Sequence, residues 1–127
     1  MRALTTKIVR IEAGDGYTAA GYGHWCPGCR GLHVFAVDQP FHNGARWTFN
    51  GDVHAPTFKP SMRIACGNKV DPDCKYGGGV CHYHLNAGRI QFLGDCTHAL
   101  ANTTVDLPDL PYRYLMPADG GVPREGN

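Results

Sequence analysis

The alternation of apolar and polar residues along this chain predicts short β-strands rather than long helices. Glycine, proline and asparagine interrupt the pattern every few residues, as expected where strands are joined by tight turns. The candidate strands cover residues 3–12, 17–23, 31–38, 46–49, 62–65 and 103–107. One short helix is predicted over residues 96–102, with Asp95 well placed as its N-cap. The pattern predicts an α+β fold that is mostly β, built on a small antiparallel sheet.

Residues 80–93 carry the clearest hairpin pattern and should form the centre of that sheet. Residues 80–85 are β-branched or aromatic, residues 86–88 favour a turn, and residues 89–93 form a second short strand. A three-residue loop with Gly88 in the left-handed conformation would pair Leu85 with Arg89. The sequence therefore predicts a hairpin with a defined register.

Histidine and cysteine alternate along the first strand of this hairpin. Because successive side chains of a strand point to opposite faces, His82 and His84 should lie on one face and Cys81 on the other. The predicted register pairs His82 with Phe92 and His84 with Ile90, so the histidines would have an apolar surrounding. The alternation therefore separates two sets of potential ligands.

The totals limit the class of protein. A chain of 127 residues predicts a single domain, which we place at residues 1–116, followed by a flexible, glycine- and proline-rich tail at 117–127. The net charge of +1, from 12 basic and 11 acidic residues, gives no general attraction to nucleic acid or membranes. No secretion signal or membrane span is evident, so we expect the cytoplasm. In that reducing compartment, six cysteines and seven histidines favour metal ligands over disulfides.

The strongest metal signal is the Cys26-Pro27-Gly28-Cys29 segment. Two thiolates separated by two residues can bind one zinc ion, and Pro27-Gly28 supplies the tight turn between them. A redox dithiol is the competing interpretation, but it would be expected to open a helix in a βαβ unit, which the pattern lacks. Cys81 and His33 could complete a closed structural site, although His33 is as readily a packed side chain. The roles of Cys66 and Cys74 stay open.

The opposite face of the hairpin predicts a second centre. His82 and His84 can present two imidazoles to one ion, and Asp95 and His98 return past the same hairpin. Ser61 follows Pro60 on an extended segment and could face them, the alternative being that its hydroxyl only caps the backbone. The alternative is that the histidines are packed core residues and Asp95 only caps a helix, which is worth about 1 kcal/mol.

The spacing His82-x-His84-x10-Asp95 resembles the ligand pattern of the JAB/MPN-type (JAMM) zinc metalloproteases. That resemblance implies a zinc-bound water activated by an upstream glutamate, for which Glu12 is the candidate. The chain departs from the pattern at Leu85, where those enzymes have proline, and at Phe92, where they have serine.

A wider resemblance covers most of the chain. It rests on five segments, which are His24–Cys29 with His33, Trp47–Asp52, Pro56–Ser61, Cys81–Tyr83 and Gly88–Leu100. These segments are similar to a small uncharacterised family frequent in phages and prophages, sometimes labelled "ammonia monooxygenase". Some relatives sit beside ubiquitin-like conjugation genes, which implies a zinc-dependent peptidase role and, for a phage protein, the host cytoplasm. His84 departs from the family, which usually has an aromatic residue there.

The leading hypothesis from the sequence is a zinc-dependent hydrolase, a peptidase or isopeptidase acting on a protein or peptide. His82 and His98 would be metal ligands or acid–base groups, Asp95 a ligand or orienting group, and Ser61 a substrate-positioning hydroxyl. The alternative is a non-catalytic zinc module that binds a host or virion protein. Nucleic-acid binding is a weaker third hypothesis, based on a possible patch of Arg30, Arg46, Arg63 and Arg89 with Trp25, Trp47 and Tyr83.

Overall fold

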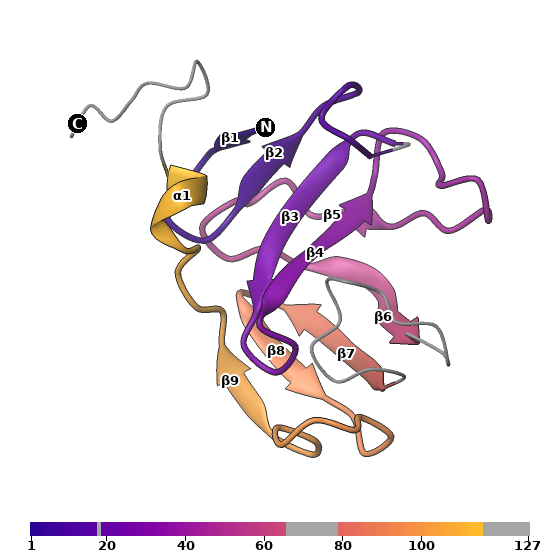
Figure 1. Cartoon of the computed structure of the whole chain (residues 1–127), viewed down its shortest axis with the longest axis vertical. Coiled ribbons are helices and arrows are strands. Elements are labelled where there is room, and N and C mark those ends of the chain that lie inside the picture. The colour runs from indigo at the N-terminus through magenta and orange to yellow at the C-terminus, as the bar shows by residue number, and fades with distance from the viewer. Residues whose placement is uncertain (18, 66–78, 116–127) are drawn as a thin grey trace.

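The computed structural model describes residues 1–17, 19–65 and 79–115, which form two antiparallel β-sheets (Figure 1). The first sheet has the order β1-β2-β3-β4, with strands β1 (Arg2–Ala3), β2 (Val9–Ile11), β3 (Gly21–Cys26) and β4 (Gly31–Ala36). The second has the order β5-β6-β7-β8-β9, with strands β5 (Thr48–Phe49), β6 (Phe58–Ala65), β7 (Val80–Asn86), β8 (Arg89–Phe92) and β9 (Thr104–Asp106). The predicted mostly β, antiparallel fold class is confirmed.

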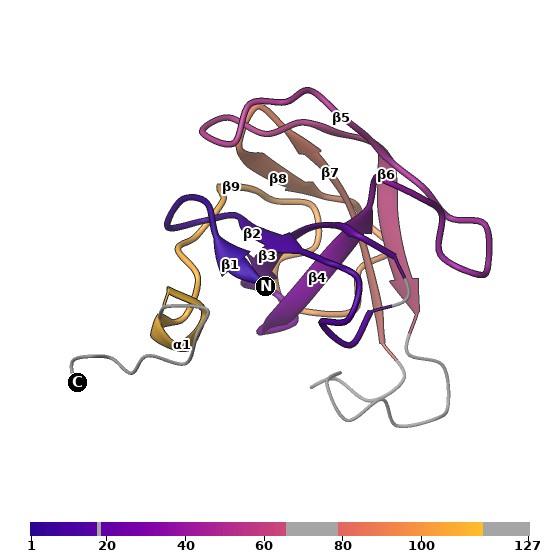
Figure 2. The same ribbon diagram turned by 90° about the horizontal axis from the view of Figure 1, so that it is seen from above.

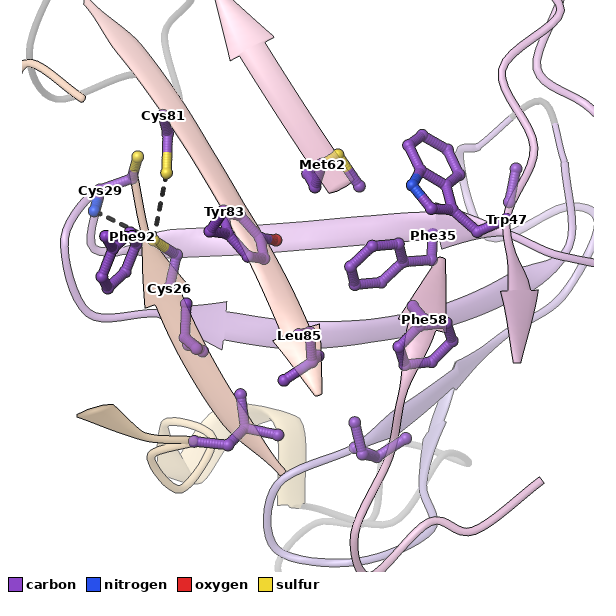
Figure 3. Close-up of a cluster of buried hydrophobic side chains, with 14 of the residues drawn as sticks. Cys26, Cys29, Phe35, Trp47, Phe58, Met62, Cys81, Tyr83, Leu85 and Phe92 are labelled. Carbon is purple, nitrogen blue, oxygen red and sulfur yellow. Dashed lines mark hydrogen bonds between the residues drawn. The ribbon is translucent and has the colours of Figure 1, made fainter. Parts of the chain in front are cut away.

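The core lies between the two sheets, which face each other in Figure 2. Aromatic rings from both sheets meet there. Phe35 of β4 and Phe58 of β6 stack with centroids 4.2 Å apart (Figure 3). Phe49 of β5 stacks on the Phe58 ring with a centroid distance of 4.7 Å. Such pairs add about 0.5–1.5 kcal/mol each beyond the burial of their area. A small domain therefore gains much of its apolar contact from a few large rings.

The hairpin β7–β8 confirms the predicted separation of faces and corrects the predicted register. Cys81 is buried in the core, whereas His84 is exposed. Leu85 pairs with Ile90 rather than with Arg89, across a two-residue turn in which Ala87 and Gly88 both have positive φ. That turn matches the twist of the flanking strands. It also keeps the apolar residues of both strands on the core face, away from the histidines.

The helix predicted over residues 96–102 is wrong. That segment consists of turns, and its backbone is held by bonds to β7 and to its own carbonyls instead of a helical ladder. Asp95 directs its carboxylate to a histidine ring and not to a helix N-terminus. The short helix of the described residues is α1 (Tyr112–Leu115), after the proline-rich 107–111 segment.

One prediction and one open question concern residues outside these ranges. The tail at 117–127 and the two cysteines Cys66 and Cys74 lie outside the described residues. Within the described residues, no helix is long and apolar enough to span a membrane.

Candidate active site and metal centre

Four buried side chains converge between the two sheets. The thiol groups of Cys26, Cys29 and Cys81 and the imidazole of His98 place their ligand atoms within 4.8 Å of one another. The Cys26 and Cys81 sulfurs are 3.8 Å apart, and His98 Nε2 lies 3.3 Å from the Cys81 sulfur. Figure 3 shows the three cysteines meeting at one end of the core. The predicted convergence of the Cys-Pro-Gly-Cys segment with Cys81 is therefore present.

The local backbone explains why these atoms meet. The Cys-Pro-Gly-Cys turn joins β3 to β4. Within this turn, the backbone amide of Cys29 donates to the Cys26 sulfur at 3.3 Å. Gly28 lies against the His98 ring, since a Cβ built there would be 2.5 Å from Nε2. The Leu100 amide donates to His98 Nδ1 at 3.2 Å, which turns Nε2 toward the sulfurs. A metal ion bound at Nε2 would take the place of the proton shared with Cys81.

The electrostatics of the thiol groups favour one negative charge but not several. Hydrogen bonds from the Cys29 and Cys81 thiols, with amide donors of the turn, lower the pKa of Cys26. The pKa of Cys81 is raised, because it shares hydrogen bonds with Cys26 and Cys29 and is buried beside their charge. Further thiolates would therefore need a neutralising cation.

The arrangement fits a tetrahedral metal site. Sulfur atoms bound to zinc at about 2.3 Å with tetrahedral angles lie about 3.8 Å apart, the separation of the Cys26 and Cys81 sulfurs. Three cysteines and one histidine form one of the usual structural zinc sets, in which protein ligands fill all four positions. The donor set can thus hold a soft divalent ion without leaving a position for water.

His33 does not lie in this cluster, contrary to the prediction that it would be the fourth ligand. In the β3–β4 hairpin, Cys26 pairs with Gly31 and His33 pairs with His24. The extended strand carries His33 away from the turn at about 3.3 Å per residue. His98 occupies the fourth place instead, which agrees with the first of its two expected roles, metal ligand or acid–base group.

His33 belongs to a buried network around the Tyr83 hydroxyl, which the sequence analysis missed. His24 Nδ1 faces the Trp25 carbonyl at 3.2 Å, so this nitrogen carries the proton and Nε2 accepts from Tyr83. His33 Nδ1 then donates to the Tyr83 oxygen at 3.1 Å. Burial, with the charge of His33, lowers the pKa of His24 to about 3, and burial raises the pKa of Tyr83. His24 is therefore neutral in the folded protein.

On the outer face of β7, three polar side chains form a continuous hydrogen-bonded chain. Ser61 Oγ lies 3.1 Å from His82 Nε2. His82 Nδ1 lies 3.1 Å and 3.0 Å from the two carboxylate oxygens of Asp95. A carboxylate can only accept, so Nδ1 carries the proton and the Ser61 hydroxyl donates to Nε2. This is the serine–histidine–aspartate order of a nucleophile, its base and an orienting acid.

One loop supplies a residue to each site. Residues 93–98 are fastened along β7, because Leu93 and Thr97 donate to the carbonyls of His82 and Val80 at 2.9 Å. The Cys96 thiol donates to the His82 carbonyl and its sulfur accepts the His82 amide, both at 3.2 Å. The loop thereby places Asp95 beside His82 on the outer face and His98 beside Cys81 in the core.

The two sites share β7 but face opposite sides of it. Neighbouring residues of a strand point in opposite directions, so Cys81 enters the metal cluster while His82 enters the polar chain. His82 is 23% exposed and Asp95 51% exposed, which leaves the polar chain open to solvent. The polar chain can therefore reach an external substrate, whereas the four ligands of the cluster are buried.

The remaining predicted site residues lie elsewhere. His84 is exposed on β7 and faces Gln91 of β8. Glu12 forms ion pairs with Arg2 and Arg10 beside the first sheet. Neither His82 nor His84 belongs to the one metal-ligand group found in the described residues. The metalloprotease ligand set expected from the spacing is not assembled.

Ser61 was expected to position substrate. Its contact with His82 also makes it a candidate nucleophile. The only sequence signal was its place on an extended segment after Pro60, which does not identify the neighbouring strand. In the structure, Arg63 pairs with His82, and an irregularity in β6 precedes Met62. That pairing brings the Ser61 hydroxyl to the histidine ring.

Comparison with known proteins gives one family. Neither the curated proteins nor the solved structures gave a match. A family model described as "Bacterial ubiquitination-like system serine protease (BubE)" matches residues 2–93, a span that includes Ser61 and His82 and ends just before Asp95. Because this match covers most of the sequence, the chain belongs to the BubE family.

Proposed function

We propose that the protein is a serine protease in which Ser61 is the nucleophile, His82 the general base and Asp95 the orienting acid. The observation that carries this proposal is the hydrogen-bonded chain from Ser61 Oγ through both nitrogens of His82 to the Asp95 carboxylate. The family description, which names a serine protease, supports the same chemistry. The proposal replaces the zinc-dependent hydrolase suggested by the sequence.

The geometry gives each residue one task. His82 Nε2 accepts the Ser61 proton as Oγ attacks the carbonyl carbon of the scissile bond. Asp95 holds the Nδ1 proton, fixes the ring tautomer and stabilises the imidazolium that forms. His82 then gives the proton to the leaving amine, and a water molecule releases the acyl group from Ser61 by the reverse transfer.

The buried cluster would have a structural role. Cys26, Cys29, Cys81 and His98 would hold zinc, whose contribution is to cross-link β3, β7 and the 93–98 loop. Four protein ligands leave no position for a catalytic water, so the ion would not activate the nucleophile. Its effect on catalysis would come through the loop that carries Asp95.

The substrate class follows from the family description and the exposed polar chain. We infer that the substrate is a polypeptide of a ubiquitination-like system, cleaved at or near a ubiquitin-like domain. An open site of this kind suits an extended chain terminus or linker better than a folded surface. The protein would act in the cytoplasm, where reduced thiols remain available for metal.

The test is cleavage of a reporter protein fused through a peptide bond to the C-terminus of a ubiquitin-like domain. Ser61→Ala and His82→Ala should each lower kcat by at least about 1,000-fold, and the double variant should lose no more than either single variant. Ser61→Ala and wild type should share their metal content and thermal stability. Full activity of Ser61→Ala would refute the proposal and favour the rival zinc-dependent or non-catalytic interpretations.

Thr57→Val is a matched control for this test. Thr57 is a hydroxyl residue just before β6, and its Oγ1 contacts Asn86 and the Ala87 amide rather than His82. Its replacement should leave kcat within about twofold of wild type, because it removes a hydroxyl without touching the polar chain.

A further inference from the structure

A groove of about 700 Å³ opens beside Ser61. Its lining residues come mainly from two long walls, the start of β4 and the second half of β6, and from the loop before β5. The residues that line it include Leu32, Val34, Phe41, Trp47, Met62 and Ile64, which give it an apolar surface. A volume of this size is typical of sites that bind a drug-sized ligand or a short peptide.

Both long walls are unpaired strand edges. Within the described residues, β4 pairs only with β3, and residues 62–65 of β6 pair only with β7. One acceptor of the β6 edge is already used, because the Trp47 indole donates to the Ser61 carbonyl at 3.2 Å. An unpaired edge offers a row of backbone donors and acceptors to an added strand. The walls therefore suit an extended polypeptide better than a compact small molecule.

The charge of the groove is one-sided. Arg46 and Arg63 line it, and none of its described lining residues is acidic. Arg46 is held in place by bonds from Nε to the Val37 carbonyl at 2.9 Å and from Nη2 to the Asp38 carbonyl at 3.1 Å. Arg63 is exposed, and none of the ion pairs between described residues includes it. Arg46 also acts on the Asp38 carboxyl, whose pKa it helps to lower, so Arg63 is the cation of the groove left to meet a ligand that carries an acidic group.

The groove also stands in the right relation to the nucleophile. Ser61 belongs to its lining, while its Oγ contacts His82 on β7. The serine thus borders both its base and the groove, as a nucleophile must if the bond that it attacks is bound there. Arg63 is two residues from Ser61 on the same strand and on the same face.

We propose that this groove is the substrate cleft of the protease and binds an extended, partly apolar segment with an acidic side chain near the scissile bond. The inference rests on the proposed function and adds the chemistry of the substrate. A two-residue separation along a strand spans about 7 Å. The acidic side chain that meets Arg63 should therefore lie about two residues from the bond that Ser61 attacks.

The experiment uses the full-length, metal-loaded protein and a library of internally quenched decapeptides, with cleaved products sequenced by mass spectrometry. For wild type, we expect aspartate or glutamate to be enriched about two residues from the cleaved bond. Arg63→Glu should lower kcat/KM for those acidic peptides by at least about tenfold and shift the preference to lysine or arginine. Arg89→Glu, which changes an exposed arginine of β8 that does not line the groove, should keep the acidic preference.

A second variant tests the apolar part. Ala45 lines the groove, so Ala45→Trp should raise KM by at least about tenfold for every library peptide while the melting temperature stays within a few degrees of wild type. In parallel, a small fluorophosphonate should label wild type but not Ser61→Ala. Absence of labelling would remove the proposed function, and this inference with it. Labelling together with an unchanged preference in Arg63→Glu, or an unchanged KM in Ala45→Trp, would overturn the inference alone.

Discussion

The contact between Gly28 and His98 gives the sharpest test of the metal centre. A methyl group at residue 28 would lie 2.5 Å from Nε2 and 2.6 Å from Nδ1 of the His98 ring. Ordinary non-bonded contacts of a carbon atom begin near about 3.5 Å, so the ring would have to move by about 1 Å. Metal–ligand distances tolerate only about 0.2 Å. Gly28→Ala should therefore remove the histidine ligand while leaving the three thiolates.

Changes outside the ligand shell alone typically weaken metal sites by about 10–100-fold. We expect Gly28→Ala, which displaces a ligand itself, to weaken zinc binding by at least about 100-fold. The measurement is competition with a chromophoric chelator for Gly28→Ala, His98→Ala and the double variant. If the methyl group acts through the His98 ring, the double variant should lose hardly more zinc affinity than His98→Ala alone.

Gly16→Ala is the control for a general effect of replacing glycine. Gly16 has a φ of 96° and open space around its Cβ position, so the change strains the backbone without touching the cluster. It should lower stability by about 1–2 kcal/mol and leave zinc affinity unchanged. The assigned geometry would be refuted if Gly28→Ala and wild type bound zinc equally well. It would also be refuted if Gly28→Ala lowered zinc affinity by the same factor in wild type and in His98→Ala.

Three further predictions follow from the same contacts. Removal of metal by a chelator should lower the melting temperature by more than about 15 °C and abolish proteolysis, and added zinc should restore both. Unchanged activity of the metal-free protein would show that the cluster is not needed to hold the loop that carries Asp95. Because burial holds the pKa of His24 at about 3, against an ordinary value near 6.5, the unfolded chain takes up the proton first as the pH falls. Below pH 6.5 this group should therefore lower the free energy of unfolding by up to about 1.4 kcal/mol per pH unit. Urea unfolding at pH 7 and pH 5 should show that His24→Gln lacks this contribution to the pH dependence. Tyr83→Phe should cost about 1–3 kcal/mol for each histidine left without its partner, with metal stoichiometry unchanged; loss of metal would contradict the separation of this network from the cluster.

The fold could be predicted from alternation, but the hairpin register could not be taken from turn residues alone. Asn86 and Gly88 suggested a three-residue loop, whereas the left-handed positions are Ala87 and Gly88. Alanine rarely marks such a turn, so the local signal was misleading. The apolar pattern held the answer, because directly paired residues share a face and Leu85 must then oppose Ile90.

The candidate site was only partly predictable because its contacts join distant segments. The thiol groups of Cys26, Cys29 and Cys81 carry a strong chemical signal, and they were placed together correctly. Choosing between His33 and His98 required knowing that the 93–98 loop returns along β7. Likewise, Ser61 and His82 meet through the pairing of β6 with β7, which composition and spacing do not encode.

The activation of Ser61 by His82 and Asp95 can be measured by peptide mapping of the metal-loaded protein after reaction with a fluorophosphonate. We expect a single phosphonyl adduct on Ser61, formed at least about 100-fold more slowly in His82→Ala. A folded, metal-loaded protein that cleaves its substrate without any adduct on Ser61 would contradict the role of Ser61 as the nucleophile.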